Sequence, residues 1–471
     1  MKLRSVILAA VILFATKTFA QKNNEIITNG MARIGLQTSF SRDYQSVGIN
    51  PANLGLFNDT GKSSILTFGL GEASVAIHSE ALPADHFIKT YFNSPSFTLE
   101  EKQEAAKIFA NEWTTMNVEI TPVAFAIQVP KVGGFAFAWK EHVRIAYKFN
   151  EFVSNAAFLG YNFDYFDEIV FIGGDAYGVV TPHDSAKLYS EIGEGTEANL
   201  NWYREFNLSF GRNIFRNDNI ELYGGIGVKL LQGYGLLNAK IENGTLSGYS
   251  ASSPIFNIDY GTVTALSAVD GTGLKSVGHG MGVDLGLTFM IMKRIKAAFA
   301  VTDLGQITWN GNVLHARDTP FDSLTFEGFD DYDIFTNVDK FMGLDGVLNW
   351  EGAVEQKVKL PAKFRFGGSV NIFDKFTVGI DVVAPLNSEP GNINGTFLGV
   401  GGDYTPIPLL RISSGLLFGG DNGFNMPLGL GISLGKTQTW QIGLATGDVL
   451  TYIVSKKPTV AASVGVLRFK L

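Results

Sequence analysis

The chain has 471 residues, of which 45% are hydrophobic, 17% are charged and 54 are Gly, and it contains no Cys. Soluble proteins average about 25% charged residues and about 7% Gly, so this composition argues against a disordered chain and against a helical bundle. Without Cys, the chain has no disulfide, thiolate metal ligand, cysteine nucleophile or lipoprotein anchor. A net charge of -8 removes the basic surface that nucleic-acid binding requires.

The start of the chain has the pattern of an export signal. Lys2 and Arg4 precede an apolar run, and the small residues Thr18 and Ala20 stand at the two positions that a signal peptidase reads. A membrane anchor is the alternative, but a spanning helix needs about 20 apolar residues, and this run is shorter. We therefore predict a signal peptide over 1–20 and an exported mature chain.

The strands expected in the mature chain alternate apolar residues with small or polar ones. From 281 to 291 every odd position is apolar, whereas the even positions include Asp284 and Thr288. The same period of two appears over 362–382 and 428–435. Strands of soluble proteins usually run about five or six residues, whereas a tilted membrane strand needs about 9 to 11. These longer runs favour a transmembrane barrel over a secreted soluble β protein.

The end of the chain points the same way. An apolar stripe that includes an aromatic ring is expected on one face of the last strand, formed by Gly465, Leu467, Phe469 and Leu471. The opposite face would carry Val464, Val466, Arg468 and Lys470. Such an ending resembles the C-terminal assembly signal of outer-membrane barrels.

Short and longer connections alternate between the predicted strands. Short turns are expected near 130–133, 216–219, 292–293, 373–374, 404–407 and 436–437, and longer connections at 80–116, 148–197, 237–276, 311–358, 388–392, 419–425 and 449–458. These connections separate fourteen strands, and their asymmetry is typical of an outer-membrane barrel with short periplasmic turns and both termini in the periplasm. Within the connection 237–276, residues 255–263 are expected to form either part of the barrel wall or an extra hairpin inside the loop.

A polar, irregular segment over 21–62 precedes the first strand, and it contains Asn50, Pro51, Ala52 and Gly55. Pro51 fixes its own φ and biases Asn50 toward extended backbone. Asn-Pro-Ala followed by Gly, placed before a fourteen-stranded barrel, resembles the N-terminal plug of the FadL-like long-chain fatty-acid transporters and of PorV, the shuttle barrel of type IX secretion. The resemblance implies that these four residues belong to a gating plug, and an ordinary Asn-Pro turn is the alternative.

Further segments resemble an uncharacterised family of FadL-related outer-membrane proteins found in Bacteroidota, over most of the mature chain. They are 98–101, 134–137, 141–143 and 360–368. The first predicts a short helix in the first outer loop, because Thr98 and Glu101 form a capping box. One face of this helix is lined by Ala105, Phe109 and Trp113. We favour a helix that packs on the loop over a helix that docks a partner.

The search for catalytic chemistry is mostly negative. The six His residues lack the spacing of a metal site, and we interpret His142 and His279 as polar residues of wall strands and His183 as a loop residue. Ser247 does not lie in the Gly-x-Ser-x-Gly elbow of a hydrolase, and an outer-membrane lipase would need a Ser and His paired across strands. We predict no enzyme activity, no catalytic residue, no metal and no cofactor.

Glycines recur on the expected inward faces of several strands, at Gly225, Gly227, Gly280, Gly282, Gly286, Gly429, Gly431 and Gly435. They would admit a plug or an ordered loop close to the wall, with strand bending as the alternative. The loop over 311–358 carries ten acidic residues against three basic ones. Divalent cations are one interpretation of this loop and a solvated surface is the favoured one, because Asp330, Asp331 and Asp333 lack the Gly and Glu of a calcium loop.

We therefore predict an all-β fold, a transmembrane antiparallel β-barrel over 63–471 with an N-terminal plug over 21–62, in the cell outer membrane. The predicted function is passive uptake of hydrophobic or amphipathic small molecules. The alternative is a non-conducting carrier barrel that binds a secretion-system or surface protein, and a structural surface protein is a third class. The predicted partners are outer-membrane lipid and a hydrophobic ligand or a protein, and nucleic acid is excluded.

Overall fold

The computed structural model describes residues 36–56, 66–82, 96–182, 185–258, 263, 265–331, 348–420, 423–435, 439–452 and 459–471. The predicted signal peptide lies outside these ranges, as do the two ends of the predicted plug segment. Among the described helices, none has the length and hydropathy to span a membrane.

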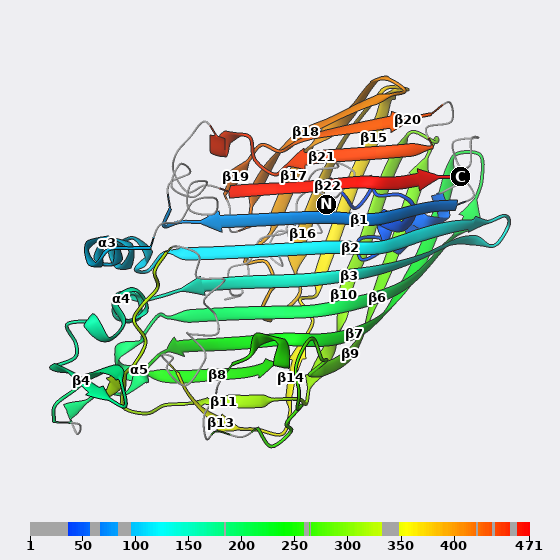
Figure 1. Ribbon diagram of the computed structural model, residues 1–471. Helices are drawn as coiled ribbons and strands as arrows, with labels where there is room; N and C mark the ends of the chain where they lie inside the picture. The colour runs from blue at the N-terminus through cyan, green and yellow to red at the C-terminus, as the bar shows by residue number, and fades with distance from the viewer. Residues whose placement is uncertain are drawn as a thin grey trace, which may run out of the picture.

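Fourteen of the described strands form one antiparallel barrel (Figure 1). They are β1 (Leu66–Ser79), β2 (Trp113–Val129), β3 (Gly133–Lys148), β6 (Glu197–Arg216), β7 (Ile220–Glu242), β9 (Gly278–Ile291), β10 (Ile295–Trp309), β15 (Lys363–Phe373), β16 (Phe376–Pro385), β17 (Phe397–Ile407), β18 (Leu410–Gly419), β20 (Leu428–Leu434), β21 (Trp440–Thr446) and β22 (Thr459–Lys470). Each pairs with the next, and β22 pairs with β1 from Thr67 opposite Lys470 to His78 opposite Thr459. This closure confirms the predicted fold.

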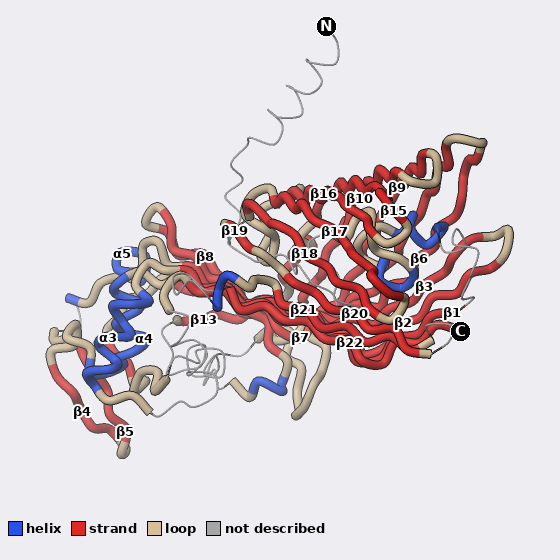
Figure 2. Tube along the Cα trace, turned by 90° about the horizontal axis from the view of Figure 1, so that it is seen from above, coloured by secondary structure: helices blue, strands red, loops and turns tan. Residues whose placement is uncertain are grey.

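The longer connections carry the remaining elements. These are α3 (Leu99–Phe109), α4 (Glu151–Leu159), η3 (Gly160–Asn162), α5 (Tyr189–Ile192), η5 (Pro254–Phe256) and η7 (Leu450–Tyr452), with the strands β4 (Glu168–Ile172), β5 (Asp175–Val179), β8 (Thr245–Ser252), β11 (Val313–Arg317), β12 (Ser323–Leu324), β13 (Asn349–Gly352), β14 (Gln356–Lys359) and β19 (Phe424–Asn425). The three α-helices gather at one end of the barrel (Figure 2). Because outer loops are the longer ones in such barrels, we call this the outer end.

The extra hairpin lies earlier in the chain than predicted. β7 continues to Glu242 and turns back through Asn243 and Gly244 into β8. Both turn residues have positive φ, 54° and 67°, as a two-residue turn between twisted strands requires. The start of the segment predicted as a hairpin, 255–256, belongs instead to the 3-10 turn η5 (Pro254–Phe256), and 259–262 lie outside the described residues.

The lipid-facing side of the barrel is the apolar one. Leu285 and Leu287 on β9 face outward and are 45% and 44% exposed, whereas the neighbouring Asp284 faces inward and is fully buried. The predicted alternation on this strand is therefore confirmed. One row of paired, outward residues nearer the outer end is polar and runs through Glu141, Arg204, Gln232 and His279. This polar row marks the edge of the apolar, lipid-facing surface that lies toward the outer end.

The last strand departs from strict alternation. The pairing of β21 with β22 shifts between Gln441 and Gly443, and beside this bulge both Val466 and Leu467 are exposed. Val464 is also exposed, while Arg468 is 4% exposed and turns inward. The predicted placement of the two valines opposite the lipid-facing stripe is therefore wrong, because a bulge adds one residue and resets the period of two.

Candidate functional site

The segment 36–56, which we call the plug, lies inside the barrel near the end with the short turns (Figure 2). It contains the 3-10 helices η1 (Asp43–Ser46) and η2 (Pro51–Leu56). η2 contacts β3, β6, β7 and β9, and nearly all plug residues are buried. A polar, irregular segment can be buried here because inward polar groups of the wall and groups of the plug itself accept or donate many of its hydrogen bonds.

Glycines of four wall strands form the seat of η2. A Cβ atom at Gly211 or Gly225 would overlap the backbone of Pro51, and one at Gly134 would overlap the carbonyl of Leu54. Gly286 likewise faces the side chain of Asn50. The wall and the plug backbone can approach this closely only because these positions lack side chains.

The predicted inward glycines therefore divide into groups. Gly225 and Gly286 contact the plug, as predicted, whereas a Cβ at Gly227 would meet Ser209 and Asn207, and one at Gly431 would meet Arg411. Gly435 has φ of 87° and directly follows the end of β20. Gly134 and Gly211 also form the seat, although their inward face was not recognised in the sequence.

All four predicted site residues lie in the plug against the wall. The side chain of Asn50 donates to Thr288 Oγ1 on β9 at 3.0 Å, and Pro51 and Ala52 begin η2 between the seat glycines. Gly55 faces Arg212 and Tyr223. Their gating role remains a prediction.

Asn53 reinforces the same contact, although the sequence analysis did not select it. Its Oδ1 accepts from Thr288 Oγ1 at 2.8 Å, and its Nδ2 donates to the carbonyls of Thr38 at 2.9 Å and Ser41 at 3.1 Å. Asn53 therefore joins both ends of the plug to β9. Its position three residues after Asn50 was the available signal.

A carboxylate on β16, which β10 and β15 separate from β9, holds the start of the plug. Asp381 on β16 accepts hydrogen bonds from the backbone N–H groups of Gln37 at 2.6 Å and Thr38 at 2.8 Å, and from the hydroxyl of Thr38 at 2.6 Å. Asp381 is 1% exposed. Hydrogen bonds to a charged acceptor in such surroundings are strong, so Asp381 is a main anchor of the plug.

A second anchor lies beside the closure of the barrel. Arg468 on β22 forms a buried ion pair with Asp43, and its guanidinium lies 4.9 Å from the centre of the Tyr44 ring. The Tyr44 hydroxyl donates to Glu72 on β1. Removing one partner of a buried ion pair usually costs more than the pair contributes, so the plug and these wall residues depend on each other.

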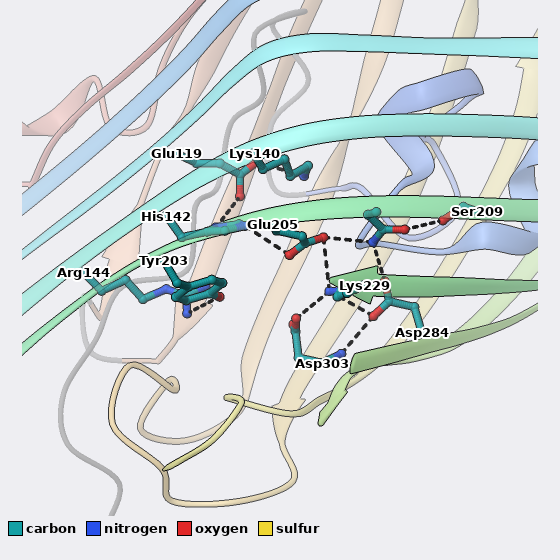
Figure 3. Close-up of polar contacts among 11 residues, drawn as sticks. Glu119, Lys140, His142, Arg144, Tyr203, Glu205, Ser209, Lys229, Asp284 and Asp303 are labelled. Carbon is teal, nitrogen blue, oxygen red and sulfur yellow. Dashed lines mark hydrogen bonds and ion pairs between the residues drawn. The ribbon is translucent and has the colours of Figure 1, made fainter. Parts of the chain in front are cut away.

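A charged network covers the inner wall next to the plug (Figure 3). Lys229 on β7 lies 2.6 Å from Asp303, 3.1 Å from Asp284 and 3.5 Å from Glu205, measured from Nζ to the carboxylate oxygens. Lys229, Asp284 and Glu205 are at most 2% exposed. Three carboxylates around one ammonium group fix the inward side chains of β6, β7, β9 and β10.

The network continues along β3 and β2. His142 lies 3.2 Å from Glu205 and 3.5 Å from Glu119, and Lys140 lies 3.1 Å from Glu119. A Cβ at Gly48 of the plug would lie 3.7 Å from Lys140 Nζ, so the network borders the plug directly. His142 is polar lining, as predicted, whereas His279 is exposed on the outward face of β9. His183 lies outside the described residues.

The outer end carries an apolar cap. The predicted capping box of Thr98 and Glu101 is present at α3, and Phe109 is 1% exposed and packs on Phe158 with ring centres 5.3 Å apart. The preferred packed loop helix is confirmed. Trp113 is the first residue of β2 rather than part of the helix.

A narrow apolar cleft lies within this cap, with a cavity volume of about 20 Å³. Phe152 of α4, Tyr189 and Ile192 of α5, Phe321 and Leu348 are among its lining residues. Burial raises the pKa of Tyr189 above its ordinary value. The cleft is closed to all but about one water molecule, so an apolar ligand would have to widen it.

The acidic loop is partly tied to the cap. Asp330 forms an ion pair with Lys102 of α3 at 2.8 Å, and Lys102 also donates to the carbonyl of Glu327. Asp333, Asp339 and Asp345 of the predicted acidic run lie outside the described residues. Within the described ranges, no group of three or more His, Asp or Glu side chains has the geometry of a metal site.

Two solved structures are similar to this chain at low sequence identity. The chain is 11% identical to the toluene transporter TodX of Pseudomonas putida, with a TM-score of 0.42 and coverage of 96% of this chain and 98% of that one. It is 11% identical to a FadL homologue of Pseudomonas aeruginosa, with a TM-score of 0.43 and coverage of 96% and 99%.

No curated protein matches the sequence. Residues 63–442, which include most of the barrel, match a family of unknown function, DUF5723. The chain therefore belongs to the DUF5723 family.

Proposed function

We propose that this barrel resides in the outer membrane and takes up hydrophobic or amphipathic small molecules passively, with the plug gating the route. The observation that carries this proposal is the seat of the plug: Gly134, Gly211, Gly225 and Gly286 accept a segment that makes no strand pairing with the wall. A segment held by side-chain hydrogen bonds and by the wall anchors Asp381 and Arg468 can leave its seat without breaking the barrel.

The chemistry along the lumen supports an amphipathic solute. The outer cap offers apolar side chains such as Phe152 and Phe321, whereas the inner wall beside the plug offers Lys229 and His142 among carboxylates. A molecule with an apolar tail and a polar head would meet partners for both parts. Small-molecule sites commonly combine an apolar lining with a few polar groups.

A carrier barrel that binds a protein partner is the second candidate. Phe109 and Trp113, which the sequence suggested as partner contacts, are buried and do not favour it. Instead, β4 carries Phe171 and Ile172, which are 74% and 59% exposed, at the outermost part of the molecule (Figure 1). Exposed aromatic side chains of this kind are frequent anchors in protein interfaces.

Uptake by cells separates gating from simple closure. Cells carrying the native chain, Pro51→Gly, or a deletion of 48–55 would be given a fluorescent fatty acid and a small sugar. Altered fatty-acid uptake at normal barrel levels supports a gate for apolar solutes, and increased sugar leakage alone indicates a simple cork. If neither flux changes while the barrel stays folded, the gating proposal is wrong.

The carrier candidate makes a different prediction. Phe171→Asp should remove a stoichiometric protein partner in gentle pull-downs and leave fatty-acid uptake unchanged. Recovery of no partner by the native chain would exclude this candidate.

A further inference from the structure

The lipid-facing wall is indented where the first and last strands meet. Ala73 and Val75 on β1 form the floor of this groove together with Ala462 and Val464 on β22, and its cavity volume is about 460 Å³. The groove runs across the strands, and larger side chains form its two ends, Leu430 and Leu444 at one end and Ile120 at the other. The groove lies on the outer surface of the barrel, separate from the plug and the cap.

The sequence explains the shape. Ala73 pairs with Val464 and Val75 with Ala462, so small side chains lie together over two neighbouring strands. Next to them, Gly71 has φ of 65°, and the pairing of β21 with β22 shifts register. Bulges bend strands and increase their twist, and here both irregularities lie on the short-turn side of the floor.

The groove faces the hydrocarbon of the membrane. Leu430 is 44% exposed, Leu444 55% and Val464 36%, and each belongs to the outward side of its strand. Leu428, which also lines the groove, is the first residue of β20 after a long outer connection. The groove therefore lies in the outer half of the bilayer.

We propose that this groove binds one acyl chain of a membrane lipid. Its volume falls within the range of about 300–1,000 Å³ that is typical of ligand sites. It crosses five strands, a span of ~19 Å from four strand spacings of about 4.8 Å, and one bilayer leaflet is about 15 Å thick in its hydrocarbon part. An apolar groove of that length in a membrane suits an extended chain.

A bound acyl chain would also improve the packing of the wall surface. Atoms that border an empty groove lose their contacts on one side, and an acyl chain lying over Ala73 and Ala462 restores them. A flat wall would offer a lipid fewer simultaneous contacts, so the groove should hold its lipid more firmly than the rest of the apolar band does. This inference does not depend on the proposed uptake function.

The test counts bound lipids on the full-length barrel in detergent by native mass spectrometry. Dimyristoyl phosphatidylethanolamine is the probe, and the variants are the native chain, Ala462→Phe and Ala297→Phe. Ala297 is an outward residue of β10 and is the matched control. Heat-modifiable gel mobility verifies that each barrel is folded, and Val75→Phe is a second filling variant if Ala462→Phe does not fold.

We expect the native chain and Ala297→Phe to bind one lipid saturably. Ala462→Phe, whose added ring fills the groove, should bind the lipid at least ten-fold more weakly. Equal binding by all variants, or no saturable binding, would overturn the proposal. If the native chain forms a dimer and Ala462→Phe dissociates it, the groove is the contact with a second copy of the chain, and the proposal is wrong. Binding of free myristate without the phospholipid would place the groove on a solute route and likewise contradict it.

Discussion

Gly224 and Gly225 are neighbours on β7 that face opposite sides of the wall. A Cβ at Gly225 would overlap the backbone of Pro51, whereas one at Gly224 would meet the side chains of Ile214 and Leu287 on the outer surface. A flexible side chain can move aside, but the backbone of a seated plug cannot do so without leaving its seat. The two positions therefore form a matched pair for testing the seat.

We expect Gly225→Val to displace the plug and Gly224→Val to leave it in place. Both substitutions add the same side chain at neighbouring positions of the same strand, so they differ in which face of the wall receives it. The measurement is leakage of a small sugar into cells at equal barrel levels, which should rise for Gly225→Val. Equal leakage for both variants would show that the seat does not hold the plug.

The outward face of β9 gives a second prediction. Leu285→Arg places a charge on the lipid-facing side near the midplane, which should lower the free energy of unfolding by about 2–4 kcal/mol. His279→Arg, on the same face but within the polar row, should cost about 0–1 kcal/mol. Urea titration of the barrel in lipid vesicles measures both, and equal costs would mean that the membrane is placed at the wrong depth.

Sequence reasoning found some of the site at this scale and missed the rest for a physical reason. Asn50 and Pro51 stand in a recognisable motif, and their burial against glycines follows from it. Asp381 and Arg468 gave no local signal, because their plug partners lie 343 or more residues away in the chain. Only the closed barrel brings these groups together.

At the scale of elements, α3 is a short helix whose start is fixed by its capping box. The carboxylate of Glu101 accepts hydrogen bonds from the backbone N–H of Thr98 at 2.7 Å and from its hydroxyl at 2.9 Å. These bonds lower the pKa of Glu101 below its ordinary value. The charged form is therefore the one that the folded helix favours.

We expect the cap of α3 to weaken as acid protonates Glu101. Because the pKa is lower in the folded helix, the stabilisation is fully present above the unfolded pKa of about 4.3 and is lost as pH falls through the folded value. Hydrogen exchange over 99–109 should accelerate at acidic pH in the native chain, after correction for intrinsic rates. Glu101→Gln should remove most of that pH dependence, and an unchanged profile in this variant would contradict the assignment.

The strands were predictable because each one lies between lipid and a polar lumen, which imposes a strict period of two on the sequence. The pattern failed at β22, where a bulge resets the period, and at the hairpin of β7 and β8, where Asn243-Gly244 was the unrecognised turn signal. Both failures concern local backbone geometry rather than the number of wall strands.

At the scale of the whole molecule, the barrel is a closed wall, and the plug lies inside it without pairing with any wall strand. Pairing of β1 with β22 satisfies the strand edges, so the wall keeps its hydrogen bonds whatever the plug does. The predicted likeness to PorV and to Bacteroidota proteins stays a prediction, as do the solute and the protein partner. The central claim is that the plug must move for solute to pass.

A reversible disulfide between plug and wall tests this claim most directly, since the native chain has no Cys. The side chains of Asn50 and Thr288 are 3.0 Å apart, so Asn50→Cys combined with Thr288→Cys can join η2 to β9, with the two single variants as controls. Uptake of a fluorescent fatty acid into vesicles should stop on oxidation of the double variant and return on reduction, while the single variants should not respond. Undiminished uptake by the fully oxidised double variant would contradict a moving plug.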